Sequence, residues 1–460
     1  MSIWTALMSL FTVLFPAVAR SSTGNLPDLT GEWTGFAAVT LFLLAYLLVA
    51  AEEFTHLKKS KPVVFAAGLM WVFIAVALNA KGFPHAAAVA VRHNILEFAE
   101  LCLFLLVAMT FINVMDDRNV FEALRSWLVR SGFSLRTLFW MTGLLAFFIS
   151  PIADNLTTAL FMCAVVMALG REYPAFVSLS CINIVVAANA GGAFSPFGDI
   201  TTLMVWQKGV VNFWDFFHLF LPSLVNWLLP AAIMSFSVPQ ITPPASSDST
   251  PIRKGGKRVI ILFLITISLA VAFHNYLHLP PMLGMTTGFG LLMFHTYFLK
   301  KTHDEESFDH PVDLFRQLAR VEWDTLWFFF GVILCVGGLG TIGFLATFSQ
   351  LLYGEWGATA ANISIGILSA VVDNIPVMFA VLTMNPDMSL GQWLLVTLTA
   401  GVGGSLLSIG SAAGVGLMGQ ARGIYTFFNH LRWSWAIALG YAASILTHFW
   451  LNADLFQKTV

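Results

Sequence analysis

Long apolar segments follow one another along most of this chain, with short polar stretches between them. About 20 consecutive apolar residues are needed to cross the hydrocarbon core of a bilayer as an α-helix. Segments close to that length or longer predict spans at 34–51, 62–80, 94–114, 174–207, 213–238, 258–274, 280–298, 323–343, 390–427 and 431–452. Two further apolar stretches, 137–170 and 357–387, each contain an Asp-Asn pair. The pattern predicts an all-α polytopic membrane protein.

Each stretch with an Asp-Asn pair is either one long helix or a re-entrant hairpin that enters the membrane and turns back. The distribution of positive charge favours the hairpin. If 34–51 runs inwards and both stretches are hairpins, most of the 23 Lys and Arg residues fall on the cytoplasmic side, as the positive-inside rule requires. If the first stretch crossed the membrane, the basic cluster at 253–258 would move outside. We therefore expect about ten spans and two hairpins.

The predicted elements occur twice in the same order. Three helices, a hairpin, a broken helix and a final helix fill 31–238, and the same series fills 258–452 in the opposite orientation. The polar segment 239–257 is the predicted cytoplasmic linker, and 453–460 is a C-terminal tail. Inverted repeats with interrupted helices are typical of secondary transporters, whose binding site lies near the bilayer midplane.

The first 30 residues allow two interpretations. They contain an apolar stretch followed by small residues near Ala17 and Ala19, but they lack a basic n-region. A cleaved signal peptide and an extra N-terminal helix therefore both stay open.

Composition supports a membrane location and narrows the chemistry. Hydrophobic residues make up 58% of the chain and charged residues only 10%, against about 25% charged residues in a soluble protein. The net charge of −2 offers no basis for binding nucleic acid. The four Cys lie in apolar segments without the spacing of metal ligands. We expect no cofactor and no enzyme activity.

Three carboxylates interrupt the apolar segments. Asp154 lies in SPIADNLTT, Asp373 in SAVVDNIPV, and Asp199 in NAGGAFSPFGDITT. An ionisable side chain deep in a membrane is costly and is a functional hypothesis by default. Each Asp can also cap the half-helix that follows it, and the two roles are compatible because capping leaves one oxygen free. Glycines and Pro196 break the helix around Asp199, which lipid tolerates only where the backbone is buried or lines a cavity.

Further oxygen donors gather at the same interruptions. Taken singly, such side chains often bond their own helix backbone. The candidates are Asn155, Thr157, Thr158, Asn189, Ser195, Thr201, Thr202, Ser369, Asn374, Ser408 and Ser411. Oxygen-rich sites suit hard cations, and three carboxylates repel an anion. Because one carboxylate holds either Na⁺ or H⁺, the pattern predicts exchange of a small cation for a proton, with Asp154 and Asp373 as the leading carriers and Asp199 as a third.

A second acidic group begins the segment HNILEFAELCLFLLV. Glu97 and Glu100 lie on one helical face, with His93 four residues before Glu97. One interpretation is that all three lie at the membrane interface. The alternative is that Glu100, two turns inside, belongs to a proton or ion route together with its neighbours.

The paired SPIADN and SAVVDN motifs and the GGAFSPFGD break resemble those of the NhaD-type sodium/proton antiporters. These belong to an ion transporter superfamily that includes dicarboxylate, citrate and arsenite carriers. The resemblance covers the chain after about residue 30. It implies a homodimer in the bacterial inner membrane, an elevator-like movement, and exchange of cytoplasmic Na⁺ or Li⁺ for external H⁺. It also implies that Asp154 and Asp373 lie on the two hairpin tips, while Ser411 stands where strict symmetry would place a second Asp199.

Two other functions remain open at this point. A sodium-coupled carboxylate or anion transporter of the same superfamily would need a cationic or neutral anion site, but no Lys or Arg lies within the motifs. A more remote alternative is an intramembrane aspartyl protease that uses two of the three Asp residues.

Overall fold

The computed structural model describes residues 26–55, 57–170, 172–242, 250–301 and 312–458. Within these ranges the chain is helical and forms no β-strand. The predicted all-α class is thus confirmed. The choice between a signal peptide and an extra helix falls almost wholly on residues 1–25, which lie outside the described residues.

The first half of the chain forms helices at each predicted position. Long apolar runs form unbroken helices, and the Asp-Asn pair and the Gly-rich segment interrupt the others. The elements are α2 (Trp33–Ala50), α3 (Glu52–Thr55), α4 (Ser60–Ala80), α5 (Ala86–Asp117), α6 (Val120–Arg130), α7 (Leu135–Ala153), α8 (Asn155–Gly170), α9 (Pro174–Gly192), α10 (Ile200–Gln207), η1 (Phe213–Leu219) and α11 (Phe220–Ser235).

The second half repeats this order of long helices and differs in its short elements, with α14 before α15 and η3 at its end. Its elements are α12 (Gly256–Leu277), α13 (Pro281–Lys301), α14 (Leu314–Ala319), α15 (Trp323–Thr341), α16 (Phe344–Ser349), η2 (Gln350–Glu355), α17 (Gly357–Leu368), α18 (Asn374–Met384), α19 (Leu390–Gly403), α20 (Ala412–Gln420), α21 (Phe427–Leu431), α22 (Ser434–Leu451) and η3 (Ala453–Gln457).

Seven helical segments of the described residues are long and apolar enough to cross a membrane. Helices α13 and α22 form where spans were predicted but are not among the seven, because Gly, Ser, Thr and His residues lower their hydropathy. Helices α8, α17, α18 and α19 are apolar but shorter, as expected for hairpin arms and half-helices.

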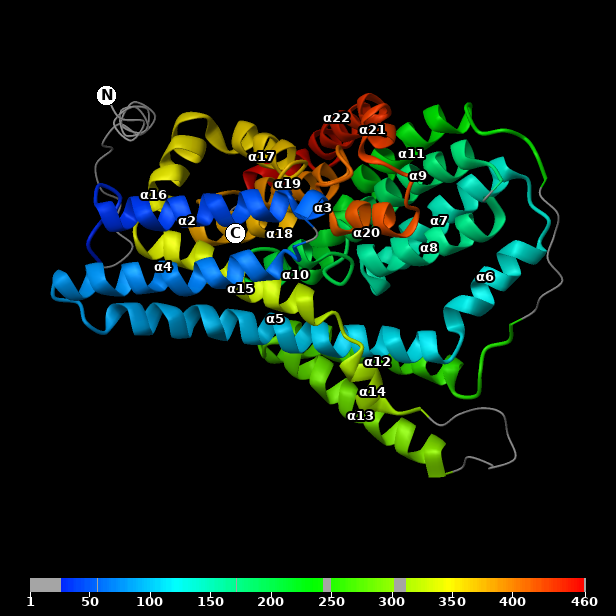
Figure 1. The fold of residues 1–460 in the computed structure, drawn as a ribbon, viewed down its shortest axis with the longest axis horizontal. Coiled ribbons are helices and arrows are strands. Elements are labelled where there is room, and N and C mark those ends of the chain that lie inside the picture. The colour runs from blue at the N-terminus through cyan, green and yellow to red at the C-terminus, as the bar shows by residue number, and fades with distance from the viewer. Residues whose placement is uncertain (1–25, 56, 171, 243–249, 302–311, 459–460) are drawn as a thin grey trace.

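The first Asp-Asn stretch doubles back on itself. Helices α7 and α8 are separated only by Asp154 and pack against each other and against α9 (Figure 1). Asp154 has φ 56° and ψ 161°, an unusual conformation for a residue with a side chain. In the second stretch, residues 369–373 join α17 to α18, which also touch.

Helix contacts follow the repeated order of the elements. Packing of α7 on α9 corresponds to packing of α17 on α19, and packing of α8 on α20 corresponds to packing of α18 on α10. Each hairpin therefore contacts the broken helix of its own half through one arm and that of the other half through the second arm. Buried side chains fill α9 and α19 along nearly their whole length, so these two helices form the centre of the core.

The helices divide into two groups. We call α2, α4, α5, α12, α13 and α15 the frame, because they pack mainly on one another. The hairpin part comprises α7 to α11 and α17 to α22, with both hairpins and both broken helices. In Figure 1 the long α5 and the pair α12 and α13 lie along the lower edge, while α7, α8, α9 and α11 gather at the upper right. Helices α15 and α18 make a direct contact between the two groups.

Candidate cation and proton site

Asp199 lies at the centre of the candidate site. Residues 193–199 interrupt the helix between α9 and α10, and Asp199 caps α10 by accepting a hydrogen bond from the Thr201 backbone N–H at 2.9 Å. Its other oxygen, Oδ2, accepts hydrogen bonds from Asn155 Nδ2 at 2.9 Å and Asn374 Nδ2 at 3.0 Å. One carboxylate, only 4% exposed, thus contacts a residue from the tip of each hairpin.

A second connection joins the two broken helices. Asn189, in the last turn before the first break, accepts a hydrogen bond from Asn155 Nδ2 at 3.1 Å and donates one to Ser405 Oγ at 2.8 Å. Ser405 lies in the second break, and its carbonyl contacts His430 Nε2 at 2.8 Å. The polar centre therefore contains side chains from both halves of the chain.

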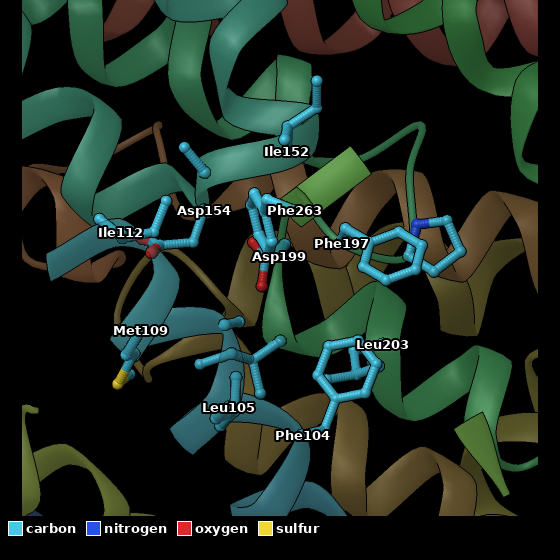
Figure 2. A pocket seen from close by; sticks show the side chains of 14 residues that line it. Phe104, Leu105, Met109, Ile112, Ile152, Asp154, Phe197, Asp199, Leu203 and Phe263 are labelled. Atoms are coloured by element: carbon cyan, nitrogen blue, oxygen red, sulfur yellow. The ribbon is translucent and has the colours of Figure 1, made fainter. Parts of the chain in front are cut away.

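Asp154 lines the same small cavity as Asp199 (Figure 2). The cavity has a volume of about 40 Å³, and apolar side chains such as Phe104 and Leu105 form most of its wall. A space of this size holds one or two species as small as water. The Asp154 carboxylate also accepts hydrogen bonds from the backbone N–H of Thr157 at 2.9 Å and from its hydroxyl at 2.8 Å, so it has both the capping role and access to the cavity.

Asp154 also borders a second cavity, which is lined by Asn113, Arg320 and Glu322. Arg320 pairs with Asp116 at 3.3 Å. The topology favoured by the positive-inside rule, with 34–51 running inwards and both Asp-Asn stretches as hairpins, predicts that Arg320 and Asp116 lie on the cytoplasmic side. Asp154 therefore lies between the Asp199 cavity and the end of the molecule that carries Arg320, which we call the Arg-rich end.

Asp373 has a different environment from Asp154. Its side chain caps α18 through the backbone N–H of Ile375 at 3.3 Å and forms an ion pair with Lys59 Nζ at 3.1 Å. It does not line the cavity shared by Asp154 and Asp199, although it is close enough for its charge to act on Asp199. The structure therefore brings the two tip Asn residues together at Asp199, while the two tip Asp residues point to different partners.

Some of the predicted hydroxyl ligands stabilise the backbone of the breaks. The single hydroxyl hydrogen of Thr202 is shared between the carbonyls of Ser195 and Asp199, each 2.7 Å from Oγ1. Ser411 Oγ makes a local bond, accepting from the Gly414 N–H. Ser195 Oγ donates to the Pro151 carbonyl in α7, and Ser369 Oγ donates to the Ala400 carbonyl in α19, so each of these bonds joins a hairpin to a broken helix. By contrast, no described residue lies in hydrogen-bonding geometry to the buried hydroxyl oxygens of Thr158, Thr201 and Ser408, and the Thr201 hydroxyl lies near the Asp199 carboxylate. An unpaired buried polar atom costs free energy, so these three oxygens remain candidate ligands, although none of the three residues lines the cavity of Asp154 and Asp199.

The acidic group on α5 lies away from this centre. Glu97 pairs with Lys208 at 3.2 Å, and His93 approaches it at 3.5 Å. Glu100 lines a cavity of about 130 Å³ with Glu97, and it also lines a wider opening of about 760 Å³. Neither of these cavities is lined by Asp154, Asp199 or Asp373.

Sequence reasoning missed three residues of this network. Lys59 lies in the basic cluster before α4, which is typical of a cytoplasmic loop, and no local pattern links it to Asp373. Ser405 was passed over in favour of Ser408, which lies three residues further along the same break. His430 stands beside Arg432 and Trp433, as an interfacial residue would, but it is 0% exposed. Only the fold brings these residues to the site.

Two hairpins and two broken helices that meet at a buried carboxylate define a polytopic membrane transporter. The family model described as "Citrate transporter" matches residues 1–401. The Na⁺/H⁺ antiporter NhaD of Alkalimonas amylolytica is 54% identical over 98% of this chain and 98% of its own length. The NhaD protein of Vibrio cholerae is 55% identical over 98% and 99% respectively. Sodium/proton antiporter 1 of Arabidopsis thaliana is 31% identical over 90% of this chain and 72% of its own. The chain belongs to the NhaD family of transporters, and its relatives are not enzymes.

Proposed function

We propose that this protein exchanges cytoplasmic Na⁺ or Li⁺ for external H⁺ across the bacterial inner membrane and so confers tolerance to sodium and alkaline pH. The observation that carries the proposal is the buried Asp199 carboxylate, which is contacted by Asn155 and Asn374 from opposite hairpins. A buried carboxylate needs a compensating charge, and a proton or a small cation can supply it. The names of the relatives from A. amylolytica and V. cholerae agree with this exchange.

Competition between Na⁺ and H⁺ for Asp199 is the core of the proposed mechanism. Without a cation, the side-chain amides of Asn155 and Asn374 donate to the carboxylate. When Na⁺ binds, rotation of either amide would present its oxygen instead, because each carries one oxygen and one NH₂ group. The hydroxyl of Thr201, which lies near Asp199 and has no well-formed hydrogen bond among the described residues, is a further neutral ligand. Protonation of the carboxylate removes its charge and releases the cation.

Asp154 provides the proposed entry from the cytoplasm. It borders both the Asp199 cavity and the cavity next to Arg320 and Glu322. In the described conformation, Na⁺ would therefore reach Asp199 from the Arg-rich end. Release on the other side requires the hairpin part to move against the frame, as in an elevator-type mechanism. The helix contacts repeated between the halves support a division into inverted repeats at 31–238 and 258–452. The homodimer rests on the family resemblance alone.

A citrate-like anion is the second candidate, because the matching family model is described as a citrate transporter. Such a substrate carries several negative charges and needs positive or neutral polar groups around it. Three carboxylates lie in or beside this site. Among the described residues, Lys59 is the one basic side chain that pairs with any of them. A cation is therefore the better match to the charge of the site.

Everted membrane vesicles containing a pH-sensitive dye test the proposal, because their outer face is the former cytoplasmic face. After acidification of the lumen, Na⁺, Li⁺ and K⁺ are added in turn to wild type and to Asp199→Asn, Asp154→Asn and Asp373→Asn. Asp387→Asn is the matched control, because Asp387 lies exposed in the turn after α18. We expect dequenching with Na⁺ and Li⁺ and little response to K⁺, with loss of the response in Asp199→Asn and in both tip variants.

Normal Na⁺ response in Asp199→Asn would contradict the central role of this carboxylate. Uptake of labelled citrate by wild-type vesicles, without any Na⁺-dependent proton efflux, would favour the anion transporter.

A further inference from the structure

The ion pair between Lys59 and Asp373 joins the two groups of helices. Lys59 immediately precedes α4, which packs on α2 and α15 in the frame. Asp373 lies at the tip of the second hairpin and caps α18. The two charged atoms are 3.1 Å apart, and the side chains are only 19% and 13% exposed. The pair must therefore separate whenever the hairpin part moves along the frame.

The frame provides other partners for Lys59. Its ammonium lies 4.4 Å from the ring centre of Phe328 on α15, a cation–π distance. Asp324, on the same helix, and Glu52, on α3, are close enough to Lys59 for their negative charges to act on it. Asp324 also accepts a hydrogen bond from Ser60, next to Lys59 in the chain. Without Asp373, the ammonium would still have the aromatic face of Phe328 and the negative charges of Glu52 and Asp324 nearby.

Among the described residues, Asp373 has no second positively charged partner comparable to those that Lys59 has on the frame. Besides Lys59, its described hydrogen-bond partner is the backbone N–H of Ile375. A partly buried carboxylate that loses its counter-charge is strongly destabilised. Separation of the pair is therefore favourable only when another positive charge takes the place of the ammonium. A transported cation that reaches this hairpin tip provides such a charge.

We propose that Lys59 is a coupling residue, whose ammonium occupies Asp373 while the transporter is empty and must be displaced by the transported cation before the hairpin part can leave the frame. The inference rests on the proposed function and extends it. It explains how binding controls movement: an empty carrier is held to the frame by the ion pair, while a loaded carrier is released. Lys59 thus competes with the transported cation for Asp373, and it also joins the frame to the hairpin part.

Substitution of Lys59 tests this role through the apparent affinity for Na⁺ in the vesicle assay. Removing the competing ammonium in Lys59→Gln should lower the Na⁺ concentration for half-maximal dye response roughly three- to tenfold, the effect of a partly exposed charge pair. Lys59→Arg keeps the charge and should stay near wild type. Lys58→Gln is the matched control, because Lys58 is the exposed neighbour with the same charge. If the half-saturating Na⁺ concentration of Lys59→Gln equals or exceeds that of Lys58→Gln, the inference is overturned.

A second measurement does not depend on transport. Spin labels are placed at Thr55→Cys, in the short α3 that packs on α2 of the frame, and at Asp387→Cys on the hairpin part. With the four native Cys replaced by Ser, they report the distance between the two parts. Without Na⁺ we expect one narrow distribution in wild type and a broad one in Lys59→Gln, and added Na⁺ should broaden the wild-type distribution. Identical narrow distributions in both proteins without Na⁺ would overturn the inference. Failure of the wild-type vesicles to respond to Na⁺ would instead overturn the proposed function.

Discussion

Two glycines at equivalent positions hold the hairpins against the broken helices. Gly191 in α9 faces the backbone of Phe147 in α7, and Gly403 in α19 faces the backbone of Gly366 in α17. A Cβ at position 191 would lie 3.0 Å from both the carbonyl carbon and the Cα of Phe147. At position 403 it would lie 2.8 Å from the carbonyl carbon of Gly366. In both cases the carbonyl oxygen would be closer still, so no flexible side chain can move aside.

The expected cost of Gly→Ala at either position follows from these contacts. Carbon atoms pack at roughly 3.5–4.0 Å, so the two helices would have to separate by about 0.5–1 Å. Overpacking of this kind costs up to about 3 kcal/mol, and the higher helix propensity of Ala returns roughly 1 kcal/mol. The net loss in unfolding free energy is therefore about 2 kcal/mol per site. Displacement of a hairpin arm would also move its tip, so the Na⁺ concentration for half-maximal transport should rise.

Thermal stability in detergent measures this effect. Purified variants are heated for a fixed time, and the fraction that still elutes as dispersed protein is measured by gel filtration. Gly290→Ala in α13 is the matched control, because a Cβ there meets no atom of the described residues within 4 Å. We expect Gly191→Ala and Gly403→Ala to unfold at lower temperature than wild type and Gly290→Ala to equal or exceed it. The packing argument is refuted if the unfolding temperatures of Gly191→Ala and Gly403→Ala equal or exceed that of Gly290→Ala.

Three further substitutions separate ion binding from structure. Thr201→Val removes a hydroxyl that makes no well-formed hydrogen bond to the described residues, so stability should hold or rise while the half-saturating Na⁺ concentration increases. An unchanged half-saturating concentration in the vesicle assay would exclude this hydroxyl as a ligand. Thr202→Val removes a hydroxyl whose single hydrogen is shared between two carbonyls at 2.7 Å and should lower stability by about 1–3 kcal/mol. The heating assay detects this loss, and wild-type stability would contradict the expectation. His430→Phe leaves the carbonyl of Ser405 without its 2.8 Å partner and should also lower the unfolding temperature, whereas an unchanged midpoint would show that this contact contributes little.

Much of the fold follows from local patterns in the sequence. Apolar length alone predicts the spans, because lipid requires every backbone polar group to be satisfied within a helix. Asp154 and Asp373 could be placed at helix interruptions for the same reason, since a charge in an apolar run is costly unless the chain breaks or binds there. The repeated order of elements was also visible, since each half carries its own Asp-Asn pair and Gly-rich break.

The partners of each side chain depended on contacts between distant segments. Sequence reasoning weighted Asp154 and Asp373 above Asp199, but Asp199 is the carboxylate that both hairpin tips contact. The pairing of Asp373 with Lys59 spans most of the chain, and no periodicity encodes such a separation. Hydropathy and helix-breaking residues act over a few turns and are readable one segment at a time. Hydrogen bonds and ion pairs at a binding site depend on how whole helices pack, and only the tertiary structure decides that.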